Sequence, residues 1–278
     1  MTDAYRLALA VAILAGAFSA NSHAALLLYE PFDYAESQDL QDDGGSELGF
    51  ASGSKWNRFW GDQICEVGDA SLSYPAATSL TPTGNRGTFA GGGGGGGENS
   101  SVYERAMDSS LHFSDGDTFW LSTLMTWDSA PTGNFDKVAL DDNELQFGQF
   151  DGDSLLTIKT GSEDKATSAF NLSVGTTYLL VAKVALVSGN DTVRMWIDPA
   201  PGKTAPADGT EDVTLTGYDL GTLGNDQGLV VAGTSTAYDL DEVRIGDEFS
   251  TVTGIPEPNA FLLALFATLP LVRPTRRP

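Results

Sequence analysis

The stretch TYLLVAKVALVSGNDTVRMWI, residues 177–197, decides the fold class of this chain. Its first half, Thr177–Val187, is almost entirely apolar with Lys183 as the single charge, which predicts a central strand buried on both faces. Ser188–Asp191 consists of turn-forming residues and predicts a tight hairpin. The second half predicts a strand that covers a core on one side only, because its residues alternate between two faces. These faces are Val193, Met195 and Ile197, and Thr192, Arg194 and Trp196.

Short runs of the same kind recur along the chain, separated by clusters of Gly, Asp, Asn, Pro and Ser. The clearest are Thr118–Trp127 and Ala237–Ile245. Weaker candidates are Leu26–Phe32, Ser101–Met107, Glu144–Phe150, Ser154–Lys159, Val213–Leu215 and Leu229–Ala232. Roughly ten or more strands without helices between them predict an all-β fold, a two-sheet antiparallel jelly-roll sandwich.

The run Ala237–Ile245 breaks the alternation of a regular strand. Its apolar residues keep one parity up to Leu240 and the opposite parity from Val243 onward. Either an extra residue bulges out of the strand at Asp241–Glu242, or the strand exchanges faces as it crosses the sandwich. We predict the bulge.

The first 24 residues have the pattern of a secretory signal peptide: one basic residue, the apolar run Leu7–Phe18 and a stretch of small and polar residues. We predict a signal helix that is cleaved between Ala24 and Ala25. The apolar run is short for a membrane span, which needs about 20 residues. A buried N-terminal helix is the alternative. The predicted organisation is a signal peptide at 1–24, a sandwich domain at 25–253 and a tail at 254–278.

The body between the two ends is strongly acidic. It carries 11 basic and 36 acidic side chains, a net charge of −25, because the ends hold four of the 15 basic and two of the 38 acidic residues. Such a surface repels nucleic acid. It suits either Ca²⁺ binding or plain solvation in a saline medium.

The single cysteine, Cys65, cannot form an internal disulfide, and we expect a small buried side chain; an intermolecular bridge is the alternative.

No catalytic constellation is recognisable in the sequence. A retaining glycosidase needs two carboxyl groups about 5–5.5 Å apart. Asp239–Glu242 has the density of carboxylates but lacks the alternate spacing, and Asp142–Glu144 offers one pair with nothing following on its face. His112 is the only histidine outside the signal segment, so a Ser-His-Asp site is possible only around it. We therefore expect a protein that is not an enzyme.

Two Asp-Gly-Asp segments are candidates for Ca²⁺ binding. They place paired carboxylates beside a flexible glycine, as oxygen-rich Ca²⁺ loops often do. The candidate ligands are Asp115, Asp117, Asp151 and Asp153. Asp-Gly-Asp is also an ordinary turn, and this simpler interpretation stays open.

An aromatic segment at residues 55–62, KWNRFWGD, is a candidate carbohydrate site. Tryptophan rings stack on sugar faces, and neighbouring polar groups can bond to hydroxyls. The candidate residues are Trp56, Asn57, Trp60 and Asp62, with Arg58 as a further hydrogen-bond donor. In the alternative interpretation, the two tryptophans pack at the edge of the sandwich.

The C-terminal tail is a proline-bracketed glutamate, a 13-residue apolar segment and a basic tip. The residues are Pro256, Glu257, Pro258, Ala260–Val272, Arg273, Arg276 and Arg277. This order resembles the PEP-CTERM sorting signal of Gram-negative bacteria. The resemblance implies transient anchoring in the inner membrane, processing by an exosortase, and release or display outside the cell, commonly alongside exopolysaccharide. As a helix the apolar segment would be only about 20 Å long, which suits a transient anchor. A C-terminal strand of the domain is the alternative.

The body resembles concanavalin A-like, LamG-type sandwiches. LLLYEPFDY near the start, YLLVAKVALVSGNDTVRMWIDPAP in the middle and YDLDEVRIGDEFSTV near the end carry this resemblance. It implies a fold but names no ligand. The leading hypothesis is an extracellular binding or matrix module, with polysaccharide as a partner. The alternatives are a structural surface protein without a small ligand, and a glycoside hydrolase of the same fold.

Overall fold

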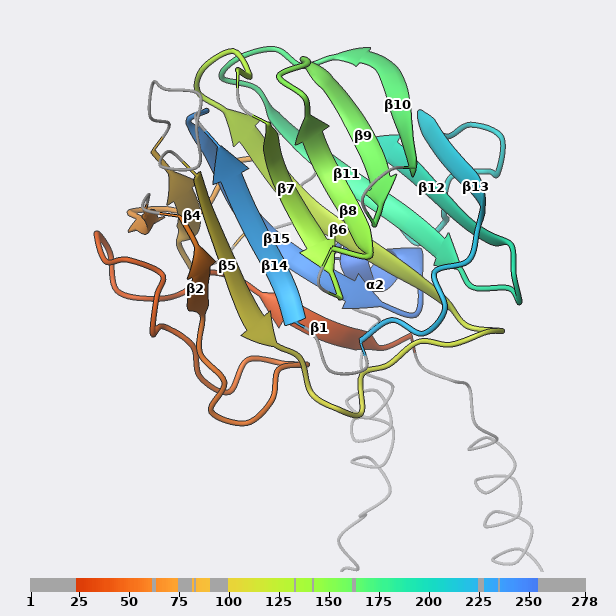
Figure 1. The fold of residues 1–278 in the computed structure, drawn as a ribbon, viewed down its shortest axis with the longest axis horizontal. Coiled ribbons are helices and arrows are strands. Elements are labelled where there is room, and N and C mark those ends of the chain that lie inside the picture. The colour runs from red at the N-terminus through yellow and green to blue at the C-terminus, as the bar shows by residue number, and fades with distance from the viewer. Residues whose placement is uncertain are drawn as a thin grey trace, which may run out of the picture. The chain divides into compact units, whose positions relative to one another are not determined.

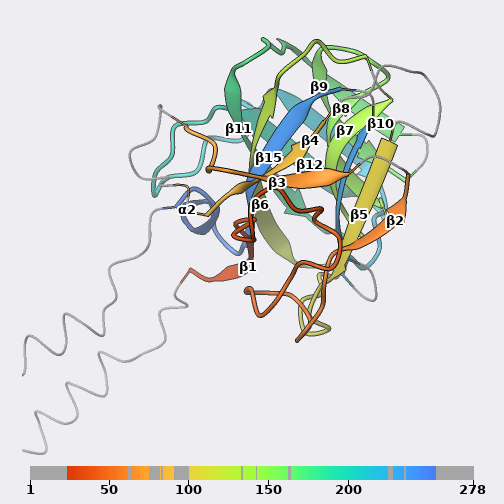
Figure 2. The ribbon, with the colours of Figure 1, turned by 90° about the vertical axis from the view of Figure 1, so that its left-hand side faces the viewer.

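A computed structural model describes residues 24–254, apart from 62–63, 75–81, 83, 91–99, 133, 142, 162–163, 225–227 and 235. Leu26–Ile255 forms one compact unit. Its strands make two antiparallel sheets that stack face to face (Figures 1 and 2). The predicted signal segment before residue 24 and the predicted sorting tail lie outside the described residues. Within the described part, no helix is long and apolar enough to cross a membrane.

The eight-stranded sheet contains the stretch that decided the fold class. Its order is β13 (Val213–Tyr218), β12 (Asp191–Ile197), β11 (Thr177–Ala185), β6 (Thr118–Trp127), β15 (Tyr238–Gly246), β4 (Arg86–Phe89) and β3 (Cys65–Gly68). An eighth strand, β1 (Leu26–Glu30), also pairs with β15. The seven-stranded sheet has the order β10 (Asp164–Asn171), β9 (Leu155–Thr160), β8 (Leu145–Phe150), β7 (Phe135–Leu140), β14 (Gly228–Thr234), β5 (Ser100–Ala106) and β2 (Asn57–Trp60).

The predicted fold class is confirmed: the chain is an all-β, two-sheet antiparallel jelly-roll sandwich. As predicted, β11 is central, lies between β12 and β6, and is buried on both faces. The predicted hairpin joins β11 to β12, where the N–H of Asn190 donates to the carbonyl of Val187 at 2.9 Å. The main core lies between the sheets and receives every second side chain of the central strands.

The predicted bulge in β15 is also confirmed. The pairing of β15 with β6 shifts register between Asp241 and Arg244. Glu242 has a φ of 55°, in the left-handed region, which marks it as the extra residue. The bulge lets Leu240 and Val243 both enter the main core, although their sequence parity differs.

The outward face of the eight-stranded sheet is more covered than the alternation in β12 predicts. Trp196 is only 3% exposed, because it stacks on Trp120 at 5.6 Å between ring centroids. The short helix α2 (Phe249–Val252) contributes Phe249 to the same second core cluster. The expectation that β12 covers a core on one side only was therefore wrong at Trp196. This outward-facing tryptophan is buried by Trp120 and by the second core cluster.

Candidate functional site

The outward face of the seven-stranded sheet is the candidate functional site. Antiparallel partners point to the same face of a sheet, so the strand pairing gives continuous rows of side chains. The first row, here the Trp60 row, crosses all seven strands. It consists of Trp60, Val102, Ala232, Lys137, Gly148, Thr157 and Thr167. The chain neighbours Tyr103, Val231 and Val138 belong to the core between the sheets, so the row faces outward.

A second row runs beside the first, and we call it the Asn57 row. It consists of Asn57, Glu104, Val230, Ala139, Gln146, Lys159 and Lys165. The pairing of β2 with β5 shifts register between Arg58 and Trp60, and this irregularity puts Asn57 and Trp60 on the same face. Two of the sequence-predicted carbohydrate residues are therefore brought together. Arg58 lies opposite Tyr103 and pairs with Asp39 at 3.5 Å.

The middle of both rows is a floor of small side chains. Ala139, Val230 and Ala232 form a packed apolar cluster with Val102 against it. Gly148 continues the floor and cannot carry a side chain, because its φ is 151° and an added Cβ would lie 2.1 Å from the carbonyl oxygen of Asp136. Neighbouring strands lie about 4.8 Å apart, so the six intervals of each row span about 29 Å. Ala139 and Ala232 are 0% exposed and Val230 is 2% exposed, so the centre of the floor is covered and only its margins reach solvent.

Polar groups bound the floor on its β7–β8 side. The ammonium of Lys137 donates to the side-chain oxygens of Asn143 at 2.6 Å and Gln146 at 2.7 Å. The amide nitrogen of Gln146 donates to the carbonyl oxygens of Asn143 and Gly161, both at 2.8 Å. Both rigid side chains are almost buried, at 7% for Lys137 and 3% for Gln146. This network fixes a nearly buried cation and amide beside the floor.

An exposed tryptophan bounds the floor at the other edge. Trp60 is 48% exposed on the edge strand β2, and its neighbour Phe59 is 67% exposed. The ring of Trp60 is therefore accessible to a ligand at this edge of the sheet. Asp62, the fourth predicted carbohydrate residue, lies outside the described residues.

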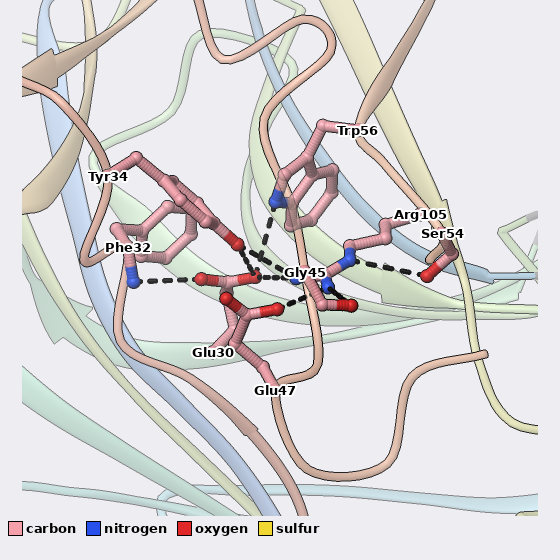
Figure 3. Close-up of polar contacts among 8 residues, drawn as sticks. All are labelled: Glu30, Phe32, Tyr34, Gly45, Glu47, Ser54, Trp56 and Arg105. Atoms are coloured by element: carbon pink, nitrogen blue, oxygen red, sulfur yellow. Dashed lines mark hydrogen bonds and ion pairs between the residues drawn. The ribbon is translucent and has the colours of Figure 1, made fainter. Parts of the chain in front are cut away.

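Trp56 lies in a different environment from Trp60, and Figure 3 shows it. It is 1% exposed and stacks on Phe32 at 6.1 Å between ring centroids. Its indole N–H donates to Oε2 of Glu30 at 3.2 Å. Trp56 is therefore a core residue that leaves no ring face for a sugar. Of the two tryptophans in the aromatic segment, one packs and one stays exposed.

The Glu30 carboxylate that Trp56 contacts belongs to a buried ionic cluster (Figure 3). Nη1 of Arg105 donates to Oε2 of Glu30 and to the hydroxyl of Tyr34, both at 2.8 Å. A second carboxylate, Glu47, accepts a short bond from Nη2 of Arg105. The side chains of Arg105 and Glu30 are both 0% exposed. Burial raises the pKa of Glu30, against the opposing effects of the Tyr34 hydroxyl and the Arg105 charge.

This buried cluster lies on the inner side of the strands that carry the candidate site. Arg105 is in β5, and its chain neighbour Glu104 points to the opposite, outward face in the Asn57 row. Trp56 directly precedes β2, which carries Asn57 and Trp60. The cluster therefore fixes the two strands that form the β2–β5 edge of the outward face.

The Ca²⁺ candidates lie in two separate turns. Gly116, between Asp115 and Asp117, has a φ of 98°, and Oδ2 of Asp117 accepts the N–H of Ser114 at 2.8 Å. Asp151 pairs with Lys165 at 2.5 Å, and this hydrogen bond lowers the pKa of Asp151. Nowhere in the described part of the chain do three or more His, Cys, Asp or Glu side chains gather as a metal site would need.

The carboxylates of β15 are covered and lie outside the candidate site. Asp241 accepts the backbone N–H groups of Leu72 at 2.8 Å and Glu242 at 2.7 Å, and it is 0% exposed. Asp239 pairs with Arg86 at 2.9 Å. These groups hold the segment before residue 75 against the outward face of the eight-stranded sheet.

Two further residues of the sequence analysis have clear positions. Cys65 is 0% exposed in the main core, as expected for a small buried side chain, and burial raises the pKa of its thiol. His112 is exposed in the segment between β5 and β6. In the ranges that the structure describes, His112 bonds to neither a serine nor a carboxylate.

Sequence reasoning missed Lys137, Gln146 and the floor of small side chains. β7 (FDKVAL) was not expected as a strand, because an aspartate and a lysine interrupt a short apolar run. A usable signal was present in the alternation of β8 (LQFGQF), where Gln146 and Gly148 share one face. Only the pairing of seven strands places these residues in rows with Trp60.

The fold defines the chain as a two-sheet jelly-roll sandwich protein. No family profile matches the chain, and no curated protein matches it. Among solved structures, an endo-1,3-β-glucanase from Streptomyces sioyaensis is similar at 10% identity and a TM-score of 0.45, covering 82% of this chain and 98% of that one.

Two further solved structures are similar to this chain. The fourth domain of an extracellular arabinanase from Geobacillus stearothermophilus, solved in complex with arabinotriose, has 15% identity and a TM-score of 0.44, covering 85% and 100% of the two chains. An endo-β-1,4-glucuronan lyase from Trichoderma reesei has 11% identity and a TM-score of 0.40, covering 82% and 98%. These likenesses concern the general path of the chain, and the sheet pairing defines the jelly roll independently of them.

Proposed function

We propose that this protein is an exported, non-catalytic module that binds a linear polysaccharide on the outward face of its seven-stranded sheet. The observation that carries the proposal is the run of small side chains on β5, β14 and β7, which lies between exposed Trp60 at one edge and the Lys137–Gln146 network on β7 and β8. An extended sugar chain can lie across the strands, because the small side chains at the centre leave the floor close to the backbone.

Each end of the floor supplies a different kind of contact. Trp60 offers a ring for stacking on a pyranose face, where apolar C–H groups leave water. Asn57 and Glu104 lie beside it and can exchange hydrogen bonds with hydroxyls. Glu104 is the only carboxylate in the two rows, and it accepts the N–H of Gly228 at 3.1 Å. Because glycoside hydrolysis uses a pair of carboxyl groups, the face suits binding rather than cleavage.

Trp60→Ala is expected to weaken polysaccharide binding about 10- to 100-fold, because the lost stacking is worth about 1.5–3 kcal/mol. A glycan array identifies the bound chain, and affinity electrophoresis then gives the relative dissociation constants of the variants. Phe170→Ala removes another exposed ring, which packs against Tyr178 at 5.3 Å between centroids and lies outside both rows. This control should bind as the unmodified protein does.

Three results would contradict the proposal in different ways. Unchanged binding by Trp60→Ala would remove the outward face as the site. A protein that binds no glycan on the array would fit a structural surface protein. Release of reducing ends during incubation with a bound polysaccharide would show a glycoside hydrolase.

The proposal includes the export route that the two ends of the sequence indicate. We expect the mature protein to begin at Ala25 and to lack Arg273, Arg276 and Arg277, because a signal peptidase and an exosortase would remove the two ends. Mass spectrometry of the secreted or surface-bound protein gives both termini. A mature protein that retains the C-terminal arginines contradicts exosortase processing, and one that retains residues 1–24 contradicts export by this signal.

A further inference from the structure

We infer that the polysaccharide bound on the outward face is anionic, with its acidic groups over the lysines of β9 and β10. This inference rests on the proposed function and names the ligand class of the same site. The first observation is the concentration of cations. The body has only 11 basic side chains, and three of them, Lys137, Lys159 and Lys165, lie in the two rows of this face.

The second observation is that two of these lysines face each other. Lys159 and Lys165 are direct cross-strand partners in the pairing of β9 with β10. Like charges at directly opposite positions destabilise a sheet, and here the nearby carboxylate of Asp151, whose pKa both lysines lower, offsets part of that repulsion. A polyanion lying over the pair would convert the repulsion into attraction, since its acid group would lie near both ammonium groups.

The third observation concerns the partners that these lysines already have. Lys165 pairs with Asp151, but both side chains are largely exposed, at 45% and 60%, so the pair is weak and replaceable. Lys159 makes no ion pair within the described residues, and its ammonium lies 5.6 Å from the centroid of the Phe150 ring. Lys137 is only 7% exposed and donates to Asn143 and Gln146, so the inference rests on Lys159 and Lys165.

The acidic net charge of the protein does not prevent such binding. At physiological salt the Debye length is about 8 Å, so exposed charges beyond that distance are largely screened. An acid group in contact with Lys159 therefore interacts mainly with the local charges, which are the two lysines and the carboxylates of Asp151 and Asp153. The distant carboxylates reduce the rate of encounter more than they weaken the bound state.

The test compares matched ligands that differ only in charge. Polyglucuronate and alginate are each offered to the mature protein beside their carboxyl-reduced, uncharged forms, in affinity electrophoresis at physiological salt. We expect at least one acidic chain to bind about tenfold or more tightly than its reduced form, as charge-assisted hydrogen bonds to a lysine predict. Lys159→Gln/Lys165→Gln should remove most of this preference and flatten its dependence on salt concentration.

Matched variants separate this inference from the proposed function. Lys183→Gln makes the same kind of charge change in β11 of the other sheet, and it should leave the preference intact. Trp60→Ala should weaken the acidic and the reduced chain alike. Thermal melting of each variant confirms that it is folded.

Each remaining outcome decides the question. Equal binding of acidic and reduced chains, binding of reduced chains alone, or a preference that persists in the double lysine variant overturns the anionic inference and leaves the proposed function standing. Failure to bind either acidic chain, while a neutral glycan on the array is bound through Trp60, does the same. Failure to bind any of these chains and any glycan on the array overturns both proposals.

Discussion

Arg105→Met is expected to lower the free energy of unfolding by about 3–5 kcal/mol, because it leaves a buried carboxylate without its cation. Glu30 is 0% exposed and would keep only the hydroxyl of Tyr34, the indole of Trp56 and the N–H of Phe32 as donors. Urea unfolding followed by tryptophan fluorescence measures the loss. The same substitution should also loosen the β2–β5 edge of the outward face.

Two controls define what this stability loss means. Arg58→Met breaks a half-exposed pair with Asp39, and it should cost less than about 1 kcal/mol. Glu30→Leu combined with Arg105→Met removes both charges and should recover part of the loss. If Arg105→Met costs no more than Arg58→Met, the buried cluster does not stabilise the sandwich.

Asp136→Asn is expected to stabilise the protein at pH 8 by up to about 4 kcal/mol relative to its effect at pH 4. Burial raises the pKa of Asp136 from 3.8 to about 7, although the N–H of Thr234 and the indole of Trp127 bond to its carboxylate. Between these two pKa values the folded state holds a proton that the unfolded state has released. Stability from this group is therefore present below about pH 4 and is lost as the pH rises toward 7.

Urea unfolding of the variant and the unmodified protein from pH 4 to pH 8 checks this sign. Burial also raises the pKa of Asp241, to about 8. Asp241 changes the stability of both proteins with pH in the same way, so the difference between the two curves reports Asp136 alone. Asp108→Asn is a control of the opposite sign, since hydrogen bonds from Ser110 lower the pKa of exposed Asp108. A difference for Asp136→Asn that does not change with pH would place its folded-state pKa at an ordinary value.

The fold was predictable for strands whose own sequence is long, apolar and typical of a β-strand. Thr177–Val187 and Thr118–Trp127 are long, apolar and rich in β-branched or aromatic residues, and both are central strands. The bulge at Glu242 could be predicted because the core residues on each side of it had incompatible parities. In contrast, β2, β3 and β4 are four residues each, and β10 is a polar edge strand, so their pairing rather than their composition makes them strands.

The candidate site was predictable only at its edge. An aromatic segment indicated the region around Trp60, but the sequence could not separate Trp60 from Trp56, because both lie in the same short segment of aromatic and polar residues. Their different fates depend on Glu30, which is 26 residues before Trp56 and accepts its indole N–H. The floor could not be predicted, because its rows combine residues from seven strands and each strand contributes only two of them.

The pairing of β1 with β15 also determines when this fold can be completed. Tyr29 lies opposite Arg244, and the Tyr29 hydroxyl donates to Oε1 of Glu242 at 3.0 Å, across 213 positions of the chain. The first of the described strands therefore pairs with the last of them. Closing so long a loop is slow relative to local pairing. A growing chain cannot seat Glu30 beside Arg105 through this pairing until β15 exists, so the nascent protein stays unfinished for almost the whole of its synthesis.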